Sequence, residues 1–338
     1  MKYKTIVQTV IFISALLLVG VFYLLINIPS SVVTPQSFSI SKGESLRSIA
    51  ERLEQTQLIS SRFIFQFYIK MTSQAKNIKA GYYFFPAYLS INNITQRITD
   101  NHILANGNFL IKEGETLKEI ENNLQQKGIL LSSQNLNHWQ IKDFSSDEYS
   151  ALFQNVALDN SLEGYLFPDS YHLSQGLSEK EIINSFLNNF SKQLAQVDLF
   201  QQGNFQHNFY ENLIMASILE KEVRTEIDKR MVADILWRRL KENFPLQIDA
   251  SICYAQNQSF IDCQLTEKAF KIDSQYNTYL YKGLPPSPIS NPGLESIKAA
   301  LNPLSNQSWY YLTDRKTGKT IYSETYEDHI IARDKYLK

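Results

Sequence analysis

The chain has 338 residues, which is long enough for two or three domains. It carries 33 basic and 34 acidic residues and no long run of Lys or Arg, so its bulk charge gives no reason to expect nucleic acid as a partner. Hydrophobic residues make up 43% of the chain and aromatic residues 12%, enough for a buried core and for aromatic surfaces that suit sugar rings, although packing is their commoner use.

The first strong feature is an apolar run near the N-terminus. Val10–Ile26 is apolar apart from one Ser and one Gly, and with its neighbours it reaches the roughly 20 residues that a spanning helix needs. Lys2 and Lys4 precede it and the next basic residue is Lys42, so the positive-inside rule places the N-terminus in the cytoplasm. No small-residue cleavage site follows. We therefore expect an uncleaved single-pass anchor in the inner (cytoplasmic) membrane, with the remainder periplasmic or extracytoplasmic.

Residues 40–53 and 111–124 repeat one pattern. Each segment has a short strand, a Gly turn, and a Ser or Thr that can cap a helix whose Leu and Ile residues share one face. Two small α+β packing units would account for this. The first copy, continued to residue 84, also resembles a LysM-like module, a small βααβ fold that often binds aminosugar polymers.

Leu162–Tyr171 is an aromatic-rich segment interrupted by Gly164 and Pro168, a composition typical of a loop that contains a turn. Loops carry binding sites more often than cores do. Glu163 could contact a ligand from this loop, although a lone acidic residue in a loop is more often simply solvated.

Residues 213–223 predict a helix, because they are rich in Leu, Met, Ala, Glu and Lys and contain no Gly or Pro. At 3.6 residues per turn, Glu220 falls in line with Leu213 and Ala216, whereas Glu222 turns to the far side and outward. The other faces are apolar, so we expect a buried helix with Glu220 in a dry setting. Such a setting favours the protonated form that a general acid needs. A structural pair between Glu220 and a nearby Lys or Arg is an equally good interpretation.

Arg224–Glu242 predicts a second amphipathic helix, with its basic side chains, Lys229 included, largely toward solvent. Leu246–Ser251 is predicted as an extended strand that places Gln247 and Asp249 on one face. Polar side chains beside a buried acid could bond the hydroxyl and acetamido groups of a sugar.

Cys253 and Cys263 are the only cysteines. In an oxidising compartment they could close a small loop by a disulfide, but their spacing alone leaves the bond open. The five His residues are scattered, with no spacing typical of metal ligands, so we expect no metal.

Five prolines between residues 285 and 303 predict a stiff loop that could hold the wall of a cleft. Within it, the Asn-Pro-Gly turn at 291–293 leads into a predicted helix, Leu294–Leu301. Trp309–Leu312 and Thr320–Ser323 flank a Lys-Thr-Gly-Lys turn, which is the pattern of a β-hairpin.

The ordered motifs LEGYLFPDSY, ASILEKE, LQxD, YNTY, GLPPSPISNPG and TYEDH resemble those of the YceG-like family of endolytic murein transglycosylases, over nearly the full chain. In that family the first Glu of the EKE motif is the catalytic acid, and it matches Glu220. The resemblance implies cleavage of the β-1,4 bond between N-acetylmuramic acid and N-acetylglucosamine within glycan strands, giving 1,6-anhydro ends without a cofactor. It also implies work beside a peptidoglycan synthase, where cleavage terminates strand elongation.

Eight residues in these motifs are the expected substrate contacts: Glu163, Tyr165, Gln247, Asp249, Tyr276, Asn277, Tyr279 and Asn291. The chain departs from the usual family pattern at four motif positions: Arg238, Ile248, Ala250 and Thr320.

We therefore expect an α+β protein with one N-terminal transmembrane helix, a small βααβ LysM-like domain and a larger mixed α/β catalytic domain. The expected segments are 1–6 for a cytoplasmic tail, 7–28 for the anchor, 37–105 for the LysM-like domain and 106–338 for the catalytic domain. The expected partners are peptidoglycan strands, the inner membrane and a synthase.

Two other functions fit the same residues. One is a muramidase, in which Asp249 or Glu163 supplies a second carboxylate and water is the nucleophile. The other is a non-catalytic anchor that binds the wall and docks a synthase. Some members of the resembled family carry the label aminodeoxychorismate lyase, a pyridoxal-phosphate activity. An extracytoplasmic chain without an evident Schiff-base lysine argues against that activity.

Overall fold

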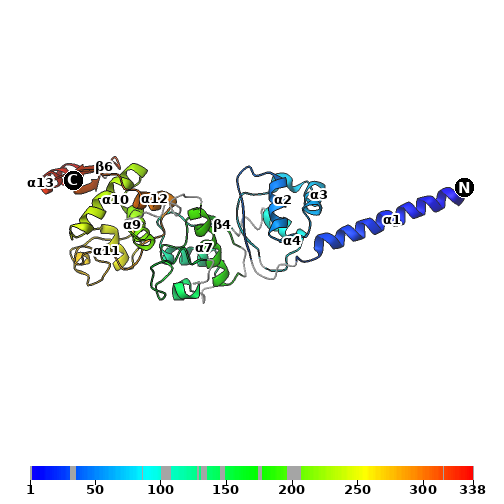
Figure 1. Ribbon diagram of the computed structural model, residues 1–338, viewed down its shortest axis with the longest axis horizontal. Coiled ribbons are helices and arrows are strands. Elements are labelled where there is room, and N and C mark those ends of the chain that lie inside the picture. Colours follow the sequence, from blue (N-terminus) through cyan, green and yellow to red (C-terminus); the bar gives the residue numbers. More distant parts are fainter. Residues whose placement is uncertain are drawn as a thin grey trace. The chain divides into compact units, whose positions relative to one another are not determined.

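The computed structural model describes residues 2–30, 36–85, 87–99, 108–127, 129–130, 135–144, 149–173, 177–195, 207–314 and 316–337 (Figure 1). The chain divides into two compact units. The first unit comprises Met1–Phe109 and Ser170–Ser185, and the second comprises Leu110–Asp169 and Phe186–Lys338. The predicted boundary between residues 105 and 106 lies outside the described residues.

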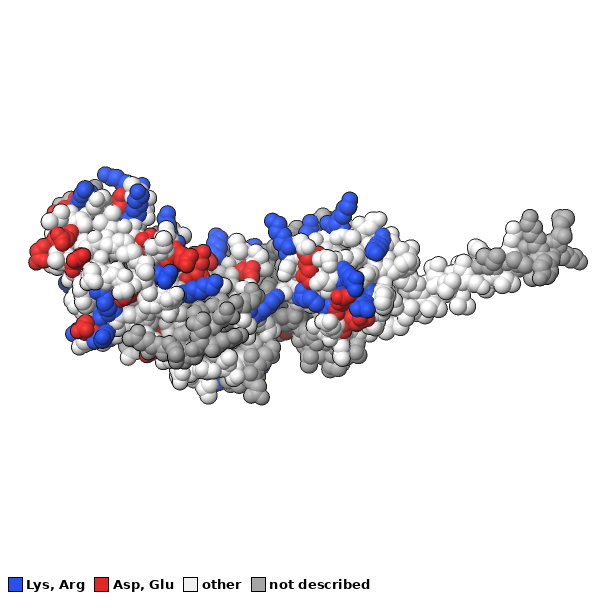
Figure 2. Space-filling model, turned by 45° about the horizontal axis from the view of Figure 1, so that its top comes forward, with Lys and Arg blue, Asp and Glu red and all other residues white. Residues whose placement is uncertain are grey.

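Helix α1 (Lys2–Asn27) forms the N-terminal part of the first unit. Its segment Gln8–Asn27 is long and apolar enough to cross a membrane, and almost all of it is exposed. Figure 2 shows this described part of the helix without charged side chains. Length and composition thus agree with the predicted anchor.

The remainder of the first unit combines a small sheet with helices. Strands β1 (Gln36–Ile40) and β2 (Gly81–Phe85) pair antiparallel, β4 (Ser170–His172) pairs parallel with β2, and β3 (Asn108–Leu110) completes the order β1-β2-β4-β3. Helices α2 (Leu46–Gln55) and α3 (Arg62–Met71) connect β1 to β2, and α4 (Ile91–Thr99) follows. The apolar faces of these elements form one core, which includes Phe38, Leu53, Phe65, Ile69, Phe85 and Ile94.

The two repeated segments fold alike, as predicted. Gly43 and Gly114 have φ values of +81° and +79°, the left-handed region that favours glycine in a tight turn. After each turn, Ser45 or Thr116 caps a helix by accepting a hydrogen bond from the backbone N–H three residues on. The second repeat thereby begins α6 (Leu117–Gln126).

The second unit is built mainly of helices: α7 (Glu179–Ala195, shared with the first unit), α9 (Phe209–Glu222), α10 (Glu226–Lys241), α11 (Asp249–Ala255), α12 (Leu294–Leu301) and α13 (Tyr326–Tyr336). Helix α9 contacts α10, α11 and α12, and its residues 212–219 are buried, which confirms the predicted buried helix. The predicted hairpin is also present as β5 (Tyr310–Thr313) and β6 (Thr320–Ser323), against which α13 packs.

The predicted strand at 246–251 is wrong, because Asp249 begins helix α11. The chain turns at Gln247, whose φ is +57°. The backbone N–H groups of Gln247 and Ile248 donate to the carbonyl and hydroxyl oxygens of Thr278, at 3.2 and 2.8 Å. An acidic residue in the first turn also suits the positive end of the helix dipole. Gln247 and Asp249 therefore do not share a strand face.

The prediction that the basic side chains of α10 lie largely toward solvent is wrong for Lys229 and Arg239. Lys229 and Arg239 are buried, whereas Ile227 is exposed. Arg239 is held by the carbonyl oxygens of Leu246 and Trp309, at 2.7 Å each. Hydrogen-bonded partners on neighbouring elements thus decide which face of α10 is buried.

Candidate active site

Glu220 lies in the last turn of α9, and its side chain is only 7% exposed. Oxygen Oε1 is 3.1 Å from Lys229 Nζ on α10. Oxygen Oε2 accepts hydrogen bonds from the Gly293 backbone N–H at 2.8 Å and from Ser296 Oγ at 2.7 Å. A buried carboxylate thus meets one cation and two neutral donors.

The start of α12 supplies the two neutral donors. Gly293 is the N-cap residue of this helix, and Ser296 is three residues further on, in its first turn. The sequence predicted the Asn-Pro-Gly turn and the helix after it. It did not predict that the N-terminus of this helix points toward Glu220. Because the N-terminus of a helix carries partial positive charge, it favours an anion at the position of Glu220.

Lys229 belongs to the site, although the sequence predicted that its side chain faces solvent. It is 3% exposed, one turn into α10, on the side that contacts α9. The sequence left two interpretations of Glu220, a buried general acid and a structural ion pair. Both stay open, because the carboxylate is buried and is also paired with Lys229.

Glu113 is a second acidic residue near Glu220 that the sequence did not single out. Its pKa is raised, first by burial and then by the negative charges of Glu220 and Glu295, while Lys229 opposes the shift. Its carboxyl group occupies the place that a side chain on Gly293 would need. The turn of the second repeat thus brings a carboxyl group to the edge of the Glu220 site.

Glu163 and Asn291 are buried in one hydrogen-bond network. Glu163 is 4% exposed and accepts from the Leu117 backbone N–H at 3.0 Å, at the start of α6. Asn291 Nδ2 donates to Glu163 Oε1 at 3.1 Å, and Asn291 Oδ1 accepts from the Leu166 backbone N–H at 2.8 Å. Both expected substrate contacts are therefore buried in this structure, where their hydrogen bonds join the start of α6, the loop at Leu166 and the proline loop.

Tyr165 and Asn277 are also buried. The Tyr165 ring packs edge-on against Phe153, with ring centroids 5.1 Å apart. Asn277 Nδ2 donates to the carbonyl oxygens of Phe270 and Ile272, at 3.1 and 2.9 Å. Four of the eight expected contacts are therefore buried in this structure.

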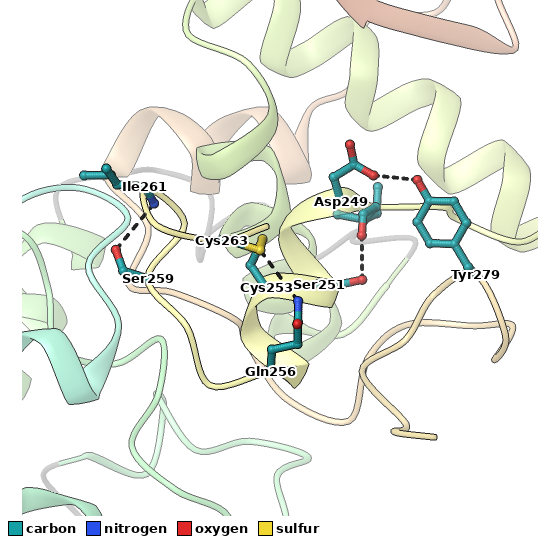
Figure 3. The surroundings of a disulfide bond; sticks show 9 residues. Asp249, Ser251, Cys253, Gln256, Ser259, Ile261, Cys263 and Tyr279 are labelled. Atoms are coloured by element: carbon teal, nitrogen blue, oxygen red, sulfur yellow. Dashed lines mark hydrogen bonds between the residues drawn. A yellow bond between two sulfur atoms is a disulfide. The ribbon is translucent and has the colours of Figure 1, made fainter. Parts of the chain in front are cut away.

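The other four expected contacts are at least partly exposed. Gln247 is open to solvent. Asp249 accepts a 2.6 Å hydrogen bond from the Tyr279 hydroxyl (Figure 3). The Tyr276 hydroxyl pairs with Ser287 Oγ, also at 2.6 Å. These residues retain the exposure that a sugar contact requires.

Glu222 does not face outward as predicted. It accepts a 3.0 Å hydrogen bond from the Tyr311 hydroxyl on β5. Burial, followed by the nearby Asp249 charge, raises its pKa to about 7. The far side of α9 is thus partly covered at Glu222, and α9 carries two acids in different surroundings.

The YceG-like family model matches residues 38–335. The chain belongs to the YceG-like family. A Bacillus subtilis (strain 168) protein named endolytic murein transglycosylase is 28% identical over 313 residues, covering 90% of this chain and 85% of that protein. A protein of the same name from Streptococcus pneumoniae serotype 2 (strain D39 / NCTC 7466) is 30% identical over 314 residues, covering 86% of this chain but 56% of its own length. A crystal structure of a yceG-like protein from Listeria monocytogenes has a TM-score of 0.58 and 28% identity, covering 88% of this chain and 99% of that one.

This YceG-like chain joins Cys253 and Cys263 in a disulfide, with the Cα atoms 5.5 Å apart (Figure 3). The bond ties the middle of α11 to the loop after it. Within that loop, the Phe260 ring lies 5.6 Å from Lys221 Nζ. The structure thus settles the pairing that spacing left open and places the closed loop beside the last turn of α9.

Two departures from the usual YceG-like pattern have structural partners here. Arg238 Nε donates to Asp234 Oδ2 at 3.0 Å within α10, and the guanidinium lies over the Trp309 ring. Thr320 pairs with Thr313 across the hairpin. Ile248 and Ala250 are buried at the start of α11.

The buried Glu163 predicts a pH dependence of stability for this YceG-like chain. Burial raises its pKa from 4.5 to about 8, against the hydrogen bonds that lower it. The folded state therefore keeps a proton that the unfolded chain loses. This contribution to stability is complete below about pH 4.5 and is lost as the pH rises through 8. We expect Glu163→Gln to remove a slope that approaches about 1.4 kcal/mol per pH unit.

Urea unfolding of the wild type and of Glu163→Gln between pH 5 and 8.5 measures this slope. Glu324→Gln changes an exposed carboxylate and serves as the control, which should follow the wild type. If the free energy of unfolding changed with pH in the same way in Glu163→Gln and in the wild type, Glu163 would not be the group that holds the proton.

Proposed function

We propose that this chain is an endolytic peptidoglycan lytic transglycosylase, with Glu220 as its catalytic residue. The observation that carries the proposal is the enclosed Glu220 carboxylate, held between α9, α10 and the start of α12, at the position of the first Glu in the EKE motif. The relatives named endolytic murein transglycosylase support the same activity.

The bond cleaved is the β-1,4 bond between N-acetylmuramic acid and N-acetylglucosamine. In the first step Glu220 gives its proton to the glycosidic oxygen, which leaves as a hydroxyl group on N-acetylglucosamine. In the second step the C6 hydroxyl oxygen of the muramoyl sugar closes on C1, and Glu220 takes the hydroxyl proton. No water is consumed, and Glu220 recovers the proton it gave.

The partners of Glu220 suit the two steps differently. Lys229 and the Gly293 N–H can only donate, so they stabilise the carboxylate that accepts the C6 proton. The Ser296 hydroxyl can donate or accept, so it can remain bonded to either form of Glu220. Lys229, Gly293 and Ser296 are therefore positioning groups for the one acid.

A muramidase remains the second candidate because Glu113 lies near Glu220. Its carboxyl could activate water, a role that the buried Glu163 cannot fill. The products separate the two reactions. Full-length protein incubated with purified peptidoglycan should release anhydro ends, each lighter by one water than the reducing ends of a muramidase, as mass spectrometry can measure. Products that carry only reducing ends would overturn the assignment as a transglycosylase.

We also propose that the first unit contains a LysM-like domain at residues 37–105, since β1, α2, α3 and β2 follow one another in the βααβ order. Helix α1 would anchor the protein in the inner membrane with the N-terminus cytoplasmic. Residues 106–338, apart from the segment Ser170–Ser185 that belongs to the first unit, would form the extracytoplasmic catalytic domain. By cleaving glycan strands, this domain would terminate the strands made by a neighbouring synthase. The rival non-catalytic anchor requires that Glu220→Gln retain every cellular effect of the protein.

Lys229→Met should lower the rate of anhydro release by roughly 10- to 100-fold, because a buried carboxylate without its cation is harder to form. Lys229→Arg keeps the charge and should retain the wild-type rate of anhydro release. An unchanged rate in Lys229→Met would mean that the ion pair does not act on Glu220 during the reaction.

A further inference from the structure

Helix α3 exposes a stripe of large apolar side chains. Phe63, Phe67 and Met71 lie four residues apart on one face and are 69%, 54% and 64% exposed. Phe65 and Ile69 on the opposite face are fully buried in the core of the first unit. The outer face of a helix on a soluble domain is normally polar, so this stripe is suited to an apolar partner.

The stripe is continuous with the C-terminal end of α1. The Phe67 ring meets the Phe22 ring edge-on, with centroids 5.3 Å apart. The same end of α1 is tied to the first unit at a second place, where Asn92 Nδ2 donates to Asn27 Oδ1 at 3.2 Å. Helices α3 and α4 both contact α1, as Figure 1 shows within this unit. The apolar stripe therefore begins on the helix expected to span the membrane.

The length of α1 fixes the depth of this contact. The apolar segment Gln8–Asn27 has 20 residues. At 1.5 Å per residue it is about 30 Å long, which equals the hydrocarbon thickness of a bilayer and leaves no surplus outside it. Phe22 precedes Asn27 by five residues, so it lies about 8 Å inside the apolar layer. Phe67 contacts Phe22 and must reach toward the same depth.

We propose that α3 lies in the interface of the membrane that α1 spans, with Phe63, Phe67 and Met71 among the lipid acyl chains. The proposal rests on the membrane anchoring proposed above. A depth of about 5–10 Å is usual for an interfacial helix. Lys70, which is exposed beside Met71, can extend its ammonium group to the headgroups. The first unit is thereby held against the lipid surface and does not swing freely on a tether.

Fluorescent labels on single introduced cysteines of the full-length protein test the depth. The sites are Phe63→Cys and Met71→Cys, which leave the Phe67–Phe22 contact intact, and the native cysteines are already joined in a disulfide. Leu17→Cys reports on α1, and Arg47→Cys, a highly exposed position on α2, is the aqueous control. Each protein is reconstituted in vesicles of phosphatidylethanolamine and phosphatidylglycerol. Quenchers are a nitroxide on the lipid acyl chain and iodide in the buffer.

Labels at 63 and 71 should be quenched several-fold more by the acyl-chain nitroxide, and several-fold less by iodide, than the label at 47. Quenching by iodide at 63 and 71, with the label at 17 protected, would overturn the interfacial position of α3 and leave the anchor standing. Protection from both quenchers at 63 and 71 would assign the stripe to a protein partner and overturn the proposal. A label at 17 that iodide reaches would refute the anchor itself.

Discussion

Glu220→Gln should abolish the release of anhydro ends, with a loss of at least roughly 10³-fold, because one carboxyl group performs both proton transfers and an amide performs neither. Mass spectrometry of the glycan products measures the loss. Glu222→Gln provides a matched control on the same helix. Its amide can still accept from the Tyr311 hydroxyl, so we expect it to retain activity to within about tenfold.

Glu220→Gln also leaves Lys229 buried without its counter-charge, which should lower the free energy of unfolding by about 3–5 kcal/mol. A loss of activity in Glu220→Gln alone could therefore reflect unfolding. The double variant Glu220→Gln/Lys229→Met removes both charges and should recover much of the stability, as a urea titration can show. A stable double variant that still releases anhydro ends would refute Glu220 as the catalytic residue.

Gly164→Ala should destabilise the second unit by about 2–5 kcal/mol, since it combines left-handed backbone strain with overpacking. Gly164 has a φ of +89°, and a Cβ atom there would lie 2.6 Å from both Cβ and Cγ of Pro288. Glu163 and Asn291 join this loop to the proline loop, so the two backbones cannot separate without breaking their hydrogen bond. The urea unfolding midpoint measures the effect.

Gly283→Ala separates the two contributions to this cost. Gly283 has a similar φ of +97°, but a Cβ atom there would meet no atom within 4 Å. We expect about 1–2 kcal/mol from the backbone strain alone. Equal losses in the two variants would show that Pro288 moves aside without cost.

Local patterns predicted α9, α12, both capped repeats and the hairpin correctly, because each depends on side chains only a few residues apart. Periodicity alone placed Glu220 inside the fold. Ser45 and Thr116 marked helix starts because a cap acts on the backbone three residues later. Family motifs added the chemical role proposed for Glu220, which periodicity could not supply.

The errors concern partners that are distant in the sequence. Lys229 appeared solvent-facing, because nothing in its own helix shows that α9 covers it with a carboxylate. Glu163 appeared to be a loop acid, because its donors come from Leu117 and Asn291, 46 and 128 residues away. Asp249 was assigned to a strand because alternation over six residues cannot reveal the turn fixed by Thr278. Glu113 gave no local signal at all.

The disulfide between Cys253 and Cys263 bears on how the protein is prepared. The three groups that hold the Glu220 carboxylate come from α10 and α12, outside the ring that the bond closes. Material made in a reducing cytosol should therefore keep its proton-transfer centre while the segment carrying Phe260 loosens. Assays on such material should therefore show intact proton transfer at Glu220, and secretion before purification should restore the order of the loop that the disulfide closes.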